Sequence, residues 1–313
     1  MSVAPRVVFL GNAPWSVPAL AALYAEGPTP VLVITRSPRP AGRGSELRST
    51  AVAEAATGWG LPLLQTETVR SGGGLAALRS AEPDVMAVVA YGEILTPEVL
   101  GVPPLGGVNL HFSLLPRWRG ASPVQHTILA GDPVAGITTM LMDEGIDTGP
   151  ILEQAELDVM PDDDTGSLGT RLAARGGDVL RHSLAGLADG TVEARPQPED
   201  GVTLAPRLGS DDRWIDWSQD AQAIGRRVRA LAPEPGASTR FRGDVLKVLR
   251  GEPVAGSGVP GVVVPLDPAV SGVAVGTGDG VFRILRVAPA GRRRMEATAW
   301  ARGARFAPGE RLG

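Results

Sequence analysis

Short apolar runs alternate with amphipathic segments along the first two thirds of the chain. Residues 6–11, 30–36 and 84–92 are rich in Val, Leu, Ile and Ala, a pattern typical of strands buried on both faces. The segment at 15–27 has apolar residues at helical spacing and ends in a glycine of the kind that closes helices. We predict further strands at 61–65, 106–113, 136–145 and 150–159, and further helices at 50–60, 74–82, 121–131 and 165–190. Strands that alternate with helices predict a parallel sheet covered on both faces.

The loop after the first predicted strand narrows the choice of ligand. Residues 11–14 read Gly-Asn-Ala-Pro, which is neither the glycine fingerprint of dinucleotide-binding folds nor a phosphate-binding loop. We therefore predict a Rossmann-like α/β domain over residues 1–190 that binds neither NAD nor ATP. Ligands of such sheets bind outside the carboxyl ends of the strands, where we expect the site.

The remaining third has a different pattern. Residues 191–206 are Pro-rich and polar without periodicity, which predicts a linker. Residues 207–313 start with one helical segment and continue with short β-rich runs separated by glycine turns, a pattern that predicts a small β-barrel. Two domains also suit a chain of 313 residues, which is more than one core usually organises.

Composition excludes several classes of protein. With 43% hydrophobic and 20% charged residues, the chain resembles ordinary globular proteins. The absence of cysteine excludes disulfides and thiolate metal sites, and three scattered histidines make a zinc site an unfavoured alternative. The apolar start of the chain is broken by Asn12, Pro14, Ser16 and Pro18, which favours strand, turn and helix over a signal peptide. Because no window reaches the roughly 20 apolar residues of a spanning helix, we predict a cytoplasmic protein without a membrane partner.

Charge is distributed unevenly between the two predicted domains. Residues 207–313 hold 17 Lys and Arg against 11 Asp and Glu, a balance of +6, whereas residues 1–206 have a balance of -10. A basic C-terminal third predicts a polyanionic partner for that third alone, and chance composition is the alternative. We see no sign of an obligate protein partner.

Three polar residues alternate along the predicted strand at 106–113. Asn109, His111 and Ser113 share one face of that strand, and successive members lie roughly 6.6 Å apart. A polar row at the carboxyl end of a buried parallel strand breaks the core pattern, as ligand sites do. The alternative is a polar cluster that satisfies its own hydrogen bonds at the end of the sheet.

The strand then breaks at Leu114-Leu115-Pro116. Proline cannot donate to the ladder, so we expect the chain to turn away and leave backbone groups free to meet a ligand. We expect Arg117 and Arg119, which follow the break, to be solvated, and attraction of an anionic substrate is the alternative.

A second candidate element is the acidic, glycine-punctuated loop at 142–150. It holds Asp143, Glu144 and Asp147 and follows the strand segment at 136–141. Position alone does not say which carboxylate matters, and the regular ligand spacing of a calcium loop is missing.

Together these residues resemble the formyltransferases that use 10-formyltetrahydrofolate. The resemblance rests on Asn109-x-His111-x-Ser113-Leu114-Leu115-Pro116, followed by Gly120 and by Asp147-Thr148-Gly149. Segments in register over nearly the whole chain are similar to the methionyl-tRNA formyltransferase family, namely 39–44, 88–95, 113–125, 212–218, 273–280 and 289–295. The family implies a formyltransferase-type Rossmann-like domain followed by an OB-like barrel that binds tRNA.

The resemblance also implies roles for particular residues. Asn109, His111 and Asp147 would be the catalytic trio, acting without a metal on 10-formyltetrahydrofolate as co-substrate and initiator methionyl-tRNA as acceptor. The turn of Ser113, Leu114, Leu115 and Pro116 would bind the folate.

The loop 37–48 resembles the family insertion that enters the tRNA acceptor stem, with Arg43 in the place of the family's arginine. This sequence departs from the family where Ser45 and Glu46 replace frequent lysines, and where Glu234 stands between prolines in place of an aromatic residue.

Three alternatives stay open on the sequence. The same trio would serve a formyltransferase acting on an amino-sugar nucleotide or on glycinamide ribonucleotide, although neither needs a basic second domain. A formyl-folate hydrolase would use water as the acceptor. An RNA-binding module with an inactive first domain would need no catalytic trio at all.

Overall fold

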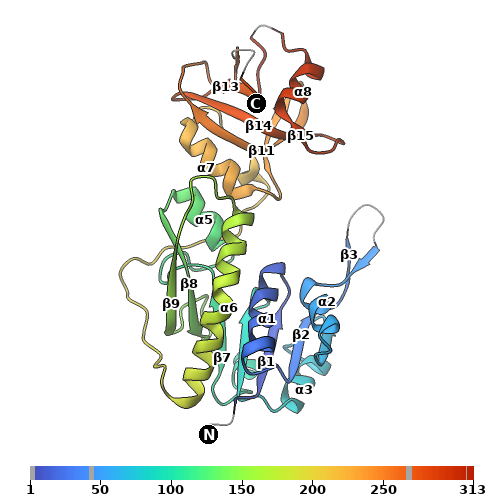
Figure 1. Cartoon of the computed structure of the whole chain (residues 1–313), viewed down its shortest axis with the longest axis vertical. Coiled ribbons are helices and arrows are strands. Elements are labelled where there is room, and N and C mark those ends of the chain that lie inside the picture. Colours follow the sequence, from blue (N-terminus) through green and yellow to red (C-terminus); the bar gives the residue numbers. More distant parts are fainter. Residues whose placement is uncertain (1–3, 42–45, 266–269, 308) are drawn as a thin grey trace. The chain divides into compact units, whose positions relative to one another are not determined.

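The chain forms two compact units, which we describe separately. The computed structural model describes residues 4–41, 46–265, 270–307 and 309–313. Unit 1 comprises Met1–Pro123, Val134–Asp158 and Gly169–Pro206, and unit 2 comprises Val124–Pro133, Val159–Leu168 and Arg207–Gly313. Figure 1 shows the elements of each unit along the chain.

Unit 1 is built on a seven-stranded sheet with the order β5-β2-β1-β6-β7-β8-β9. Its strands are β1 (Val7–Gly11), β2 (Leu32–Arg36), β5 (Leu63–Thr66), β6 (Val85–Val89), β7 (Gly107–His111), β8 (Val134–Leu141) and β9 (Ile151–Asp158). All residues of β1 and β6 are buried, as expected of central strands covered on both faces. The predicted α/β fold with a parallel sheet is confirmed for the first five strands in this order.

The last two strands of this sheet run antiparallel to their neighbours. β8 pairs with β7 and β9 pairs with β8 in antiparallel register, so the sheet is mixed rather than parallel throughout. The loop between β8 and β9 is too short for the crossover of a dozen or more residues that a parallel pair requires. After two buried residues, β9 alternates half-buried and exposed positions, as an edge strand with one solvated face does.

Helices cover both faces of this sheet. α1 (Val17–Glu26) and α6 (Thr165–Asp189) lie beside one another over β1 and β7 (Figure 1). Two glycines of α6 allow this close packing, because a Cβ at Gly176 would lie 2.8 Å from Leu110 Cδ2 and one at Gly177 would lie 2.9 Å from Ala22 Cβ. α3 (Gly72–Ser80) and α4 (Pro97–Leu100) share a core on the other face with apolar side chains of β1, β2 and β6.

Two shorter helices and a hairpin complete the elements of the first half. α2 (Ala51–Gly58) follows β2, and α5 (Pro123–Ala130) lies between β7 and β8. The predicted tRNA loop contains a two-stranded hairpin of β3 (Arg39–Ala41) and β4 (Glu46–Arg48). Arg43 and Ser45 lie outside the described residues, so the tRNA-binding role of Arg43 stays a prediction.

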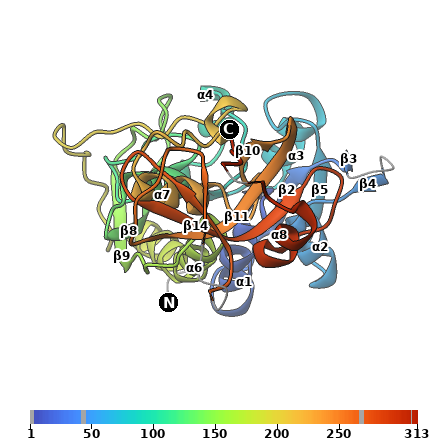
Figure 2. The same cartoon turned by 90° about the horizontal axis from the view of Figure 1, so that it is seen from above.

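Unit 2 is organised around a curled antiparallel sheet. Its order is β10-β11-β14-β13-β12, with β15 paired to β14, and its strands are β10 (Ala237–Phe241), β11 (Asp244–Val254), β12 (Val263–Val264), β13 (Val273–Gly276), β14 (Val281–Pro289) and β15 (Met295–Glu296). α7 (Ala221–Leu231) and α8 (Ala297–Ala304) lie at opposite ends of the β11–β14 pair in both views (Figures 1 and 2). Trp217, Phe282 and Trp300 are among the buried side chains of its core.

The final residues of the chain join the two edges of this curled sheet. Leu312 forms a bridge with Phe241 of β10, and Arg311 forms one with Val262 beside β12. The structure of residues 207–313 is therefore a curled half-barrel rather than the complete small barrel predicted, and residues 310–313, the closing piece, bridge its two edges.

The segment predicted as a linker is held along unit 1. Within residues 191–206, Arg195 bridges to Ile151 and Leu204 bridges to Arg119. The functional division of the chain at 191–206 stays a prediction.

Candidate functional site

Asn109 and His111 come from the carboxyl-terminal end of β7, between parallel β6 and antiparallel β8. Alternation along the strand places both side chains on one face. His111 is 6% exposed and Asn109 is half-buried. Two of the three residues of the predicted polar row thus lie where a parallel sheet offers its ligand site, whereas Ser113 lies beyond the end of β7.

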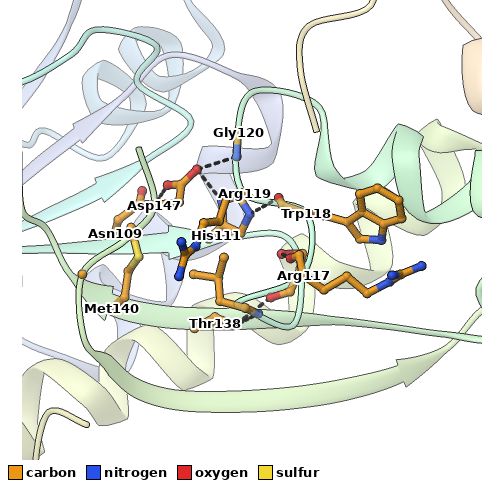
Figure 3. Close-up of polar contacts among 12 residues, drawn as sticks. Asn109, His111, Arg117, Trp118, Arg119, Gly120, Thr138, Met140 and Asp147 are labelled. Carbon is orange, nitrogen blue, oxygen red and sulfur yellow. Dashed lines mark hydrogen bonds and ion pairs between the residues drawn. The ribbon is translucent and has the colours of Figure 1, made fainter. Parts of the chain in front are cut away.

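Asp147 reaches this pair from the loop between β8 and β9 (Figure 3). Asn109 Nδ2 donates to Asp147 Oδ1 over 3.3 Å, and Asp147 Oδ2 lies 3.5 Å from His111 Nδ1. The backbone N–H of Gly120 donates to the same Oδ2 over 2.9 Å. The structure therefore brings together the amide, the imidazole and the carboxylate that the sequence predicted.

The imidazole of His111 lies between two oxygen acceptors. Its Nε2 lies 2.9 Å from the carbonyl oxygen of Trp118, and its Nδ1 faces the carboxylate of Asp147. A neutral imidazole can donate to only one acceptor, whereas the protonated ring can donate to both. The ring is thereby held in orientation by a partner at each nitrogen.

Two backbone conformations near the histidine are unusual. Asp147 has φ +53° and Trp118 has φ +63°, both in the left-handed region. An aspartate tolerates this region because its short side chain can hydrogen-bond locally, whereas a bulky tryptophan does so at a cost on the order of 1 kcal/mol or more. Both residues face His111, so the unusual backbone coincides with the candidate site.

The other two acids of the loop have different surroundings. Asp143 accepts hydrogen bonds from Gly145 N at 3.0 Å and from the Thr148 hydroxyl at 2.8 Å, so its carboxylate shapes the loop itself. Glu144 is exposed. Asp147 alone of the three contacts Asn109 and His111, which answers the question that sequence position left open.

The turn after β7 differs from its prediction. We expected free backbone groups at Leu114-Leu115-Pro116, but the Leu115 N–H donates to the Thr138 hydroxyl at 3.1 Å and the Leu115 carbonyl accepts from Gln154 Nε2 at 2.9 Å. The Leu114 carbonyl accepts from Arg117 N at 3.0 Å. That prediction is wrong because neighbouring side chains and the turn itself satisfy these groups.

The four side chains of the predicted folate turn are not equally accessible. Ser113 is 1% exposed and donates to the Arg117 carbonyl at 2.6 Å, and Leu115 packs in a small core with Met140 and Ile151. Leu114 and Pro116 are half-buried. These last two are therefore the side chains of the turn that a ligand could reach.

Arg117 and Arg119 are also less solvated than expected. The Arg117 guanidinium stacks 4.3 Å from the centre of the Trp118 ring (Figure 3). Arg119 donates from Nη2 to Gln197 Oε1 at 2.7 Å. Sequence reasoning missed Gln197, because a single glutamine in a Pro-rich stretch carries no periodic or motif signal.

A cavity of about 320 Å³ opens at the carboxyl ends of β1, β2, β5 and β6. Its lining includes Arg36, Arg70 and Glu93, with Asn12 and Tyr91 at its inner part. The Asn12 side chain accepts from Arg36 N at 2.8 Å and donates to the Tyr91 carbonyl, so it ties three strand ends together. Burial raises the pKa of the Tyr91 phenol, and the nearby Glu93 raises it further. The topological rule for ligand sites predicted this edge but not these residues.

The described part of the chain shows neither a metal-binding cluster nor a membrane-spanning helix. No group of three or more His, Cys, Asp or Glu side chains there is arranged to hold a metal ion. None of the helices there combines the length and apolar character that a bilayer-spanning segment needs.

Comparison with known proteins places the chain. The family model for formyl transferases matches residues 5–184, and the model for the formyl transferase C-terminal domain matches residues 207–305. A methionyl-tRNA formyltransferase of Streptomyces griseus is 45% identical over 98% of this chain and 99% of its own. One of Thermus thermophilus is 43% identical over the same shares of the two chains. The chain belongs to the methionyl-tRNA formyltransferase family.

Solved structures share the fold of this family member at low sequence identity. The methionyl-tRNA formyltransferase of Clostridium thermocellum is 16% identical, with a TM-score of 0.56 over 79% of this chain and 93% of its own. An N-formyltransferase of Helicobacter canadensis, in complex with folinic acid and dTDP-3-aminofucose, has a TM-score of 0.66 at 15% identity over 93% of this chain and 100% of its own. HypX of Aquifex aeolicus, in complex with tetrahydrofolic acid, has a TM-score of 0.64 at 18% identity over 98% of this chain and 49% of its own.

Proposed function

We propose that the protein transfers the formyl group of 10-formyltetrahydrofolate to the α-amino group of initiator methionyl-tRNA. The product would be N-formylmethionyl-tRNA, which links one-carbon metabolism to translation initiation. The observation that carries the proposal is the contact of one carboxylate, Asp147, with both Asn109 and His111. Relatives named for this activity, aligned over 98% of the chain, support the choice of acceptor.

The chemistry accounts for the residue types. The amine nitrogen attacks the formyl carbon, the carbonyl oxygen takes up negative charge, and the bond from carbon to N10 then breaks. Asn109 Nδ2 carries two hydrogens, of which one is directed to Asp147 Oδ1, so the other can donate to the developing oxyanion.

Proton balance requires a group that accepts and releases a proton. The attacking amine loses one proton and N10 gains one, and imidazole is the side chain suited to such transfers near neutral pH. Asp147 orients the ring of His111 through Nδ1. Neither a metal nor a covalent intermediate on the protein is required by this scheme.

Substrate binding completes the proposal. Leu114 and Pro116 would offer apolar contact to the folate, whereas Ser113 and Leu115 would hold the turn from within. Arg43 would contact the tRNA. Residues 1–190 would form the catalytic domain, 191–206 the linker and 207–313 the tRNA-binding domain, whose charge balance of +6 suits a polyanion.

One assay separates the candidate acceptors. Purified protein is incubated with 10-formyltetrahydrofolate labelled in the formyl group and with methionyl initiator tRNA, an amino-sugar nucleotide, glycinamide ribonucleotide, or buffer alone. We expect label on the aminoacyl-tRNA only, with a rate that falls steeply as salt rises, because phosphate contacts release counterions. Label on a small nucleotide, or formate released without an acceptor, would show that the assignment is wrong.

A further inference from the structure

A stretch of chain between the two family-model matches crosses the candidate site. We call residues 195–205 the strap. Arg195 exchanges two backbone hydrogen bonds with Ile151, at 2.7 and 2.8 Å. Farther along, Thr203 O accepts from Arg119 N at 2.9 Å, and Ala205 N donates to Arg119 O at 2.7 Å. The strap therefore joins the strand that follows the Asp147 loop to the loop that covers His111.

Gln197 makes this connection at the site itself. Its Nε2 donates to the carbonyl oxygens of Asp147 and Gly149, each over 2.8 Å. Its Oε1 accepts from Arg119 Nε at 3.0 Å and from Nη2 at 2.7 Å. One half-buried amide thus satisfies two carbonyls of one loop and a guanidinium of the other.

The backbone of Asp147 determines where its side chain points. Its left-handed conformation, which an aspartate adopts more readily than most residues, directs the carboxylate at Asn109 and His111, so a hydrogen bond that holds this backbone also holds the carboxylate. The Gln197 hydrogen bond to the Asp147 carbonyl acts on the same residue whose carboxylate orients the histidine.

We propose that Gln197 is a positioning residue for the formyl transfer, acting through Asp147. The inference rests on the proposed function, because it assigns Gln197 a part in the chemistry of that same trio. This role requires the NH₂ group of the Gln197 side chain, because the carbonyl oxygens of Asp147 and Gly149, each 2.8 Å away, can only accept hydrogen bonds.

Two variants separate the donors from the acceptor. Gln197→Met keeps the length of the side chain and removes both kinds of hydrogen bond. Gln197→Glu keeps an acceptor for Arg119 but places a carboxylate against two carbonyls. We expect kcat to fall roughly 10- to 100-fold in both, since a misplacement of about 1 Å can cost that much, with KM values for both substrates changed less than about threefold. The exposed Glu199 of the same strap gives the matched control, and Glu199→Gln should keep wild-type kcat.

A double-mutant cycle tests whether Gln197 acts through Asp147. In an Asp147→Asn background, Gln197→Met should lower kcat by no more than about twofold, because the function it supports is already lost. A general structural role would instead give the same loss in both backgrounds and a matching drop in melting temperature. Wild-type kcat in Gln197→Glu, or additive losses in the cycle, would overturn the inference. Failure of the wild-type protein to formylate methionyl-tRNA would overturn the proposed function itself.

Discussion

At the scale of single residues, His111 has the most constrained surroundings in the site. Its two nitrogens face the Trp118 carbonyl and the Asp147 carboxylate, and both of these residues have left-handed backbones. The ring is therefore held by groups whose positions depend on two separate loops. Such a ring is oriented before the substrates arrive, which lowers the cost of reaching the transition state.

Replacing this ring gives the first residue-scale prediction. We expect His111→Ala to fold and to lose activity by roughly 10²- to 10⁴-fold, the usual contribution of a general acid–base group. The measurement is single-turnover formylation of methionyl-tRNA, with the melting temperature as the check on folding. Wild-type turnover in a folded variant would contradict the role given to the histidine.

Alternation along β7 was enough to predict that Asn109 and His111 lie on one face, because side-chain direction in a strand follows from sequence position alone. The family resemblance, rather than the pattern, singled out Asp147. The sequence pattern could not show which acid of the loop 142–150 faces the site. That depends on tertiary contacts such as the hydrogen bond from Thr148 to Asp143, which keeps the Asp143 carboxylate within the loop. The contacts of Gln197 could not be predicted for a similar reason, since its partners lie about 50 and 80 residues away in sequence.

At the scale of elements, the loop between β8 and β9 carries Asp147 and allows little space at Gly149. A Cβ added there would lie 1.8 Å from the Leu141 carbonyl oxygen, which is backbone and cannot move aside cheaply. Gly149→Ala should therefore shift the loop and lower kcat on the order of 10- to 100-fold. Gly73→Ala is the matched control, because nothing lies within 4 Å of a Cβ there. Steady-state formylation kinetics of both variants test this prediction. Equal kcat values would contradict the claim that Gly149 is needed for the position of the Asp147 loop.

The stability that the closing piece, residues 310–313, gives to unit 2 should decrease at acid pH. Arg242 donates to both carboxylate oxygens of Glu310, at 3.0 and 2.8 Å, and these hydrogen bonds, with one from Ala307 N, lower the pKa of Glu310 from 4.5 to about 2. A lowered pKa in the folded state means that the stabilisation is complete above about pH 4.5 and is lost as the pH falls toward 2. The melting temperature of wild type should exceed that of Glu310→Gln at pH 7, and the difference should shrink between pH 4.5 and pH 2. A difference that stays constant over this range would contradict the assignment.

Hydrophobic periodicity predicted most elements because buried strands and amphipathic helices differ in period. It did not predict the antiparallel direction of β8 and β9, because side-chain alternation is the same in both directions. For β9 that information lies in its short connection to β8, whereas residues 112–133 between β7 and β8 contain α5 and are long enough for either direction.

At the scale of the whole molecule, unit 2 is not one continuous piece of sequence. It takes in Val124–Pro133 and Val159–Leu168 besides residues 207–313. Thr165 donates to the Ala230 carbonyl at 2.7 Å, and Arg226 donates to the Leu129 carbonyl at 3.2 Å. Composition could divide the chain near residue 206 but could not identify these two segments, because such pairings follow from tertiary packing rather than local pattern.

The charge of unit 2 leads to a prediction about salt. Arg292 and Arg293 are exposed in the turn between β14 and β15, beside Arg294, which pairs with Glu234. If they contact phosphates, replacing both by Ala should weaken tRNA binding and make the negative slope of log K against log salt shallower by about 2, near 1 per contact. Arg79→Ala, on unit 1, is the control and should leave the slope unchanged. Filter binding of tRNA over a salt series measures the slope, and an unchanged slope in the double variant would contradict phosphate contacts by Arg292 and Arg293.

The closing piece of unit 2 bears on how the chain can be handled in the laboratory. Residues 310–313 cover hydrogen-bonding groups on β10 and beside β12 that would otherwise face water, since Gly313 N donates to Arg240 O at 3.0 Å and Leu312 N to Gly261 O at 2.8 Å. Trimming those four residues would uncover two β-edges at once, and uncovered edges are where folded proteins recruit one another into aggregates. An affinity tag placed at the amino end would leave this seam intact.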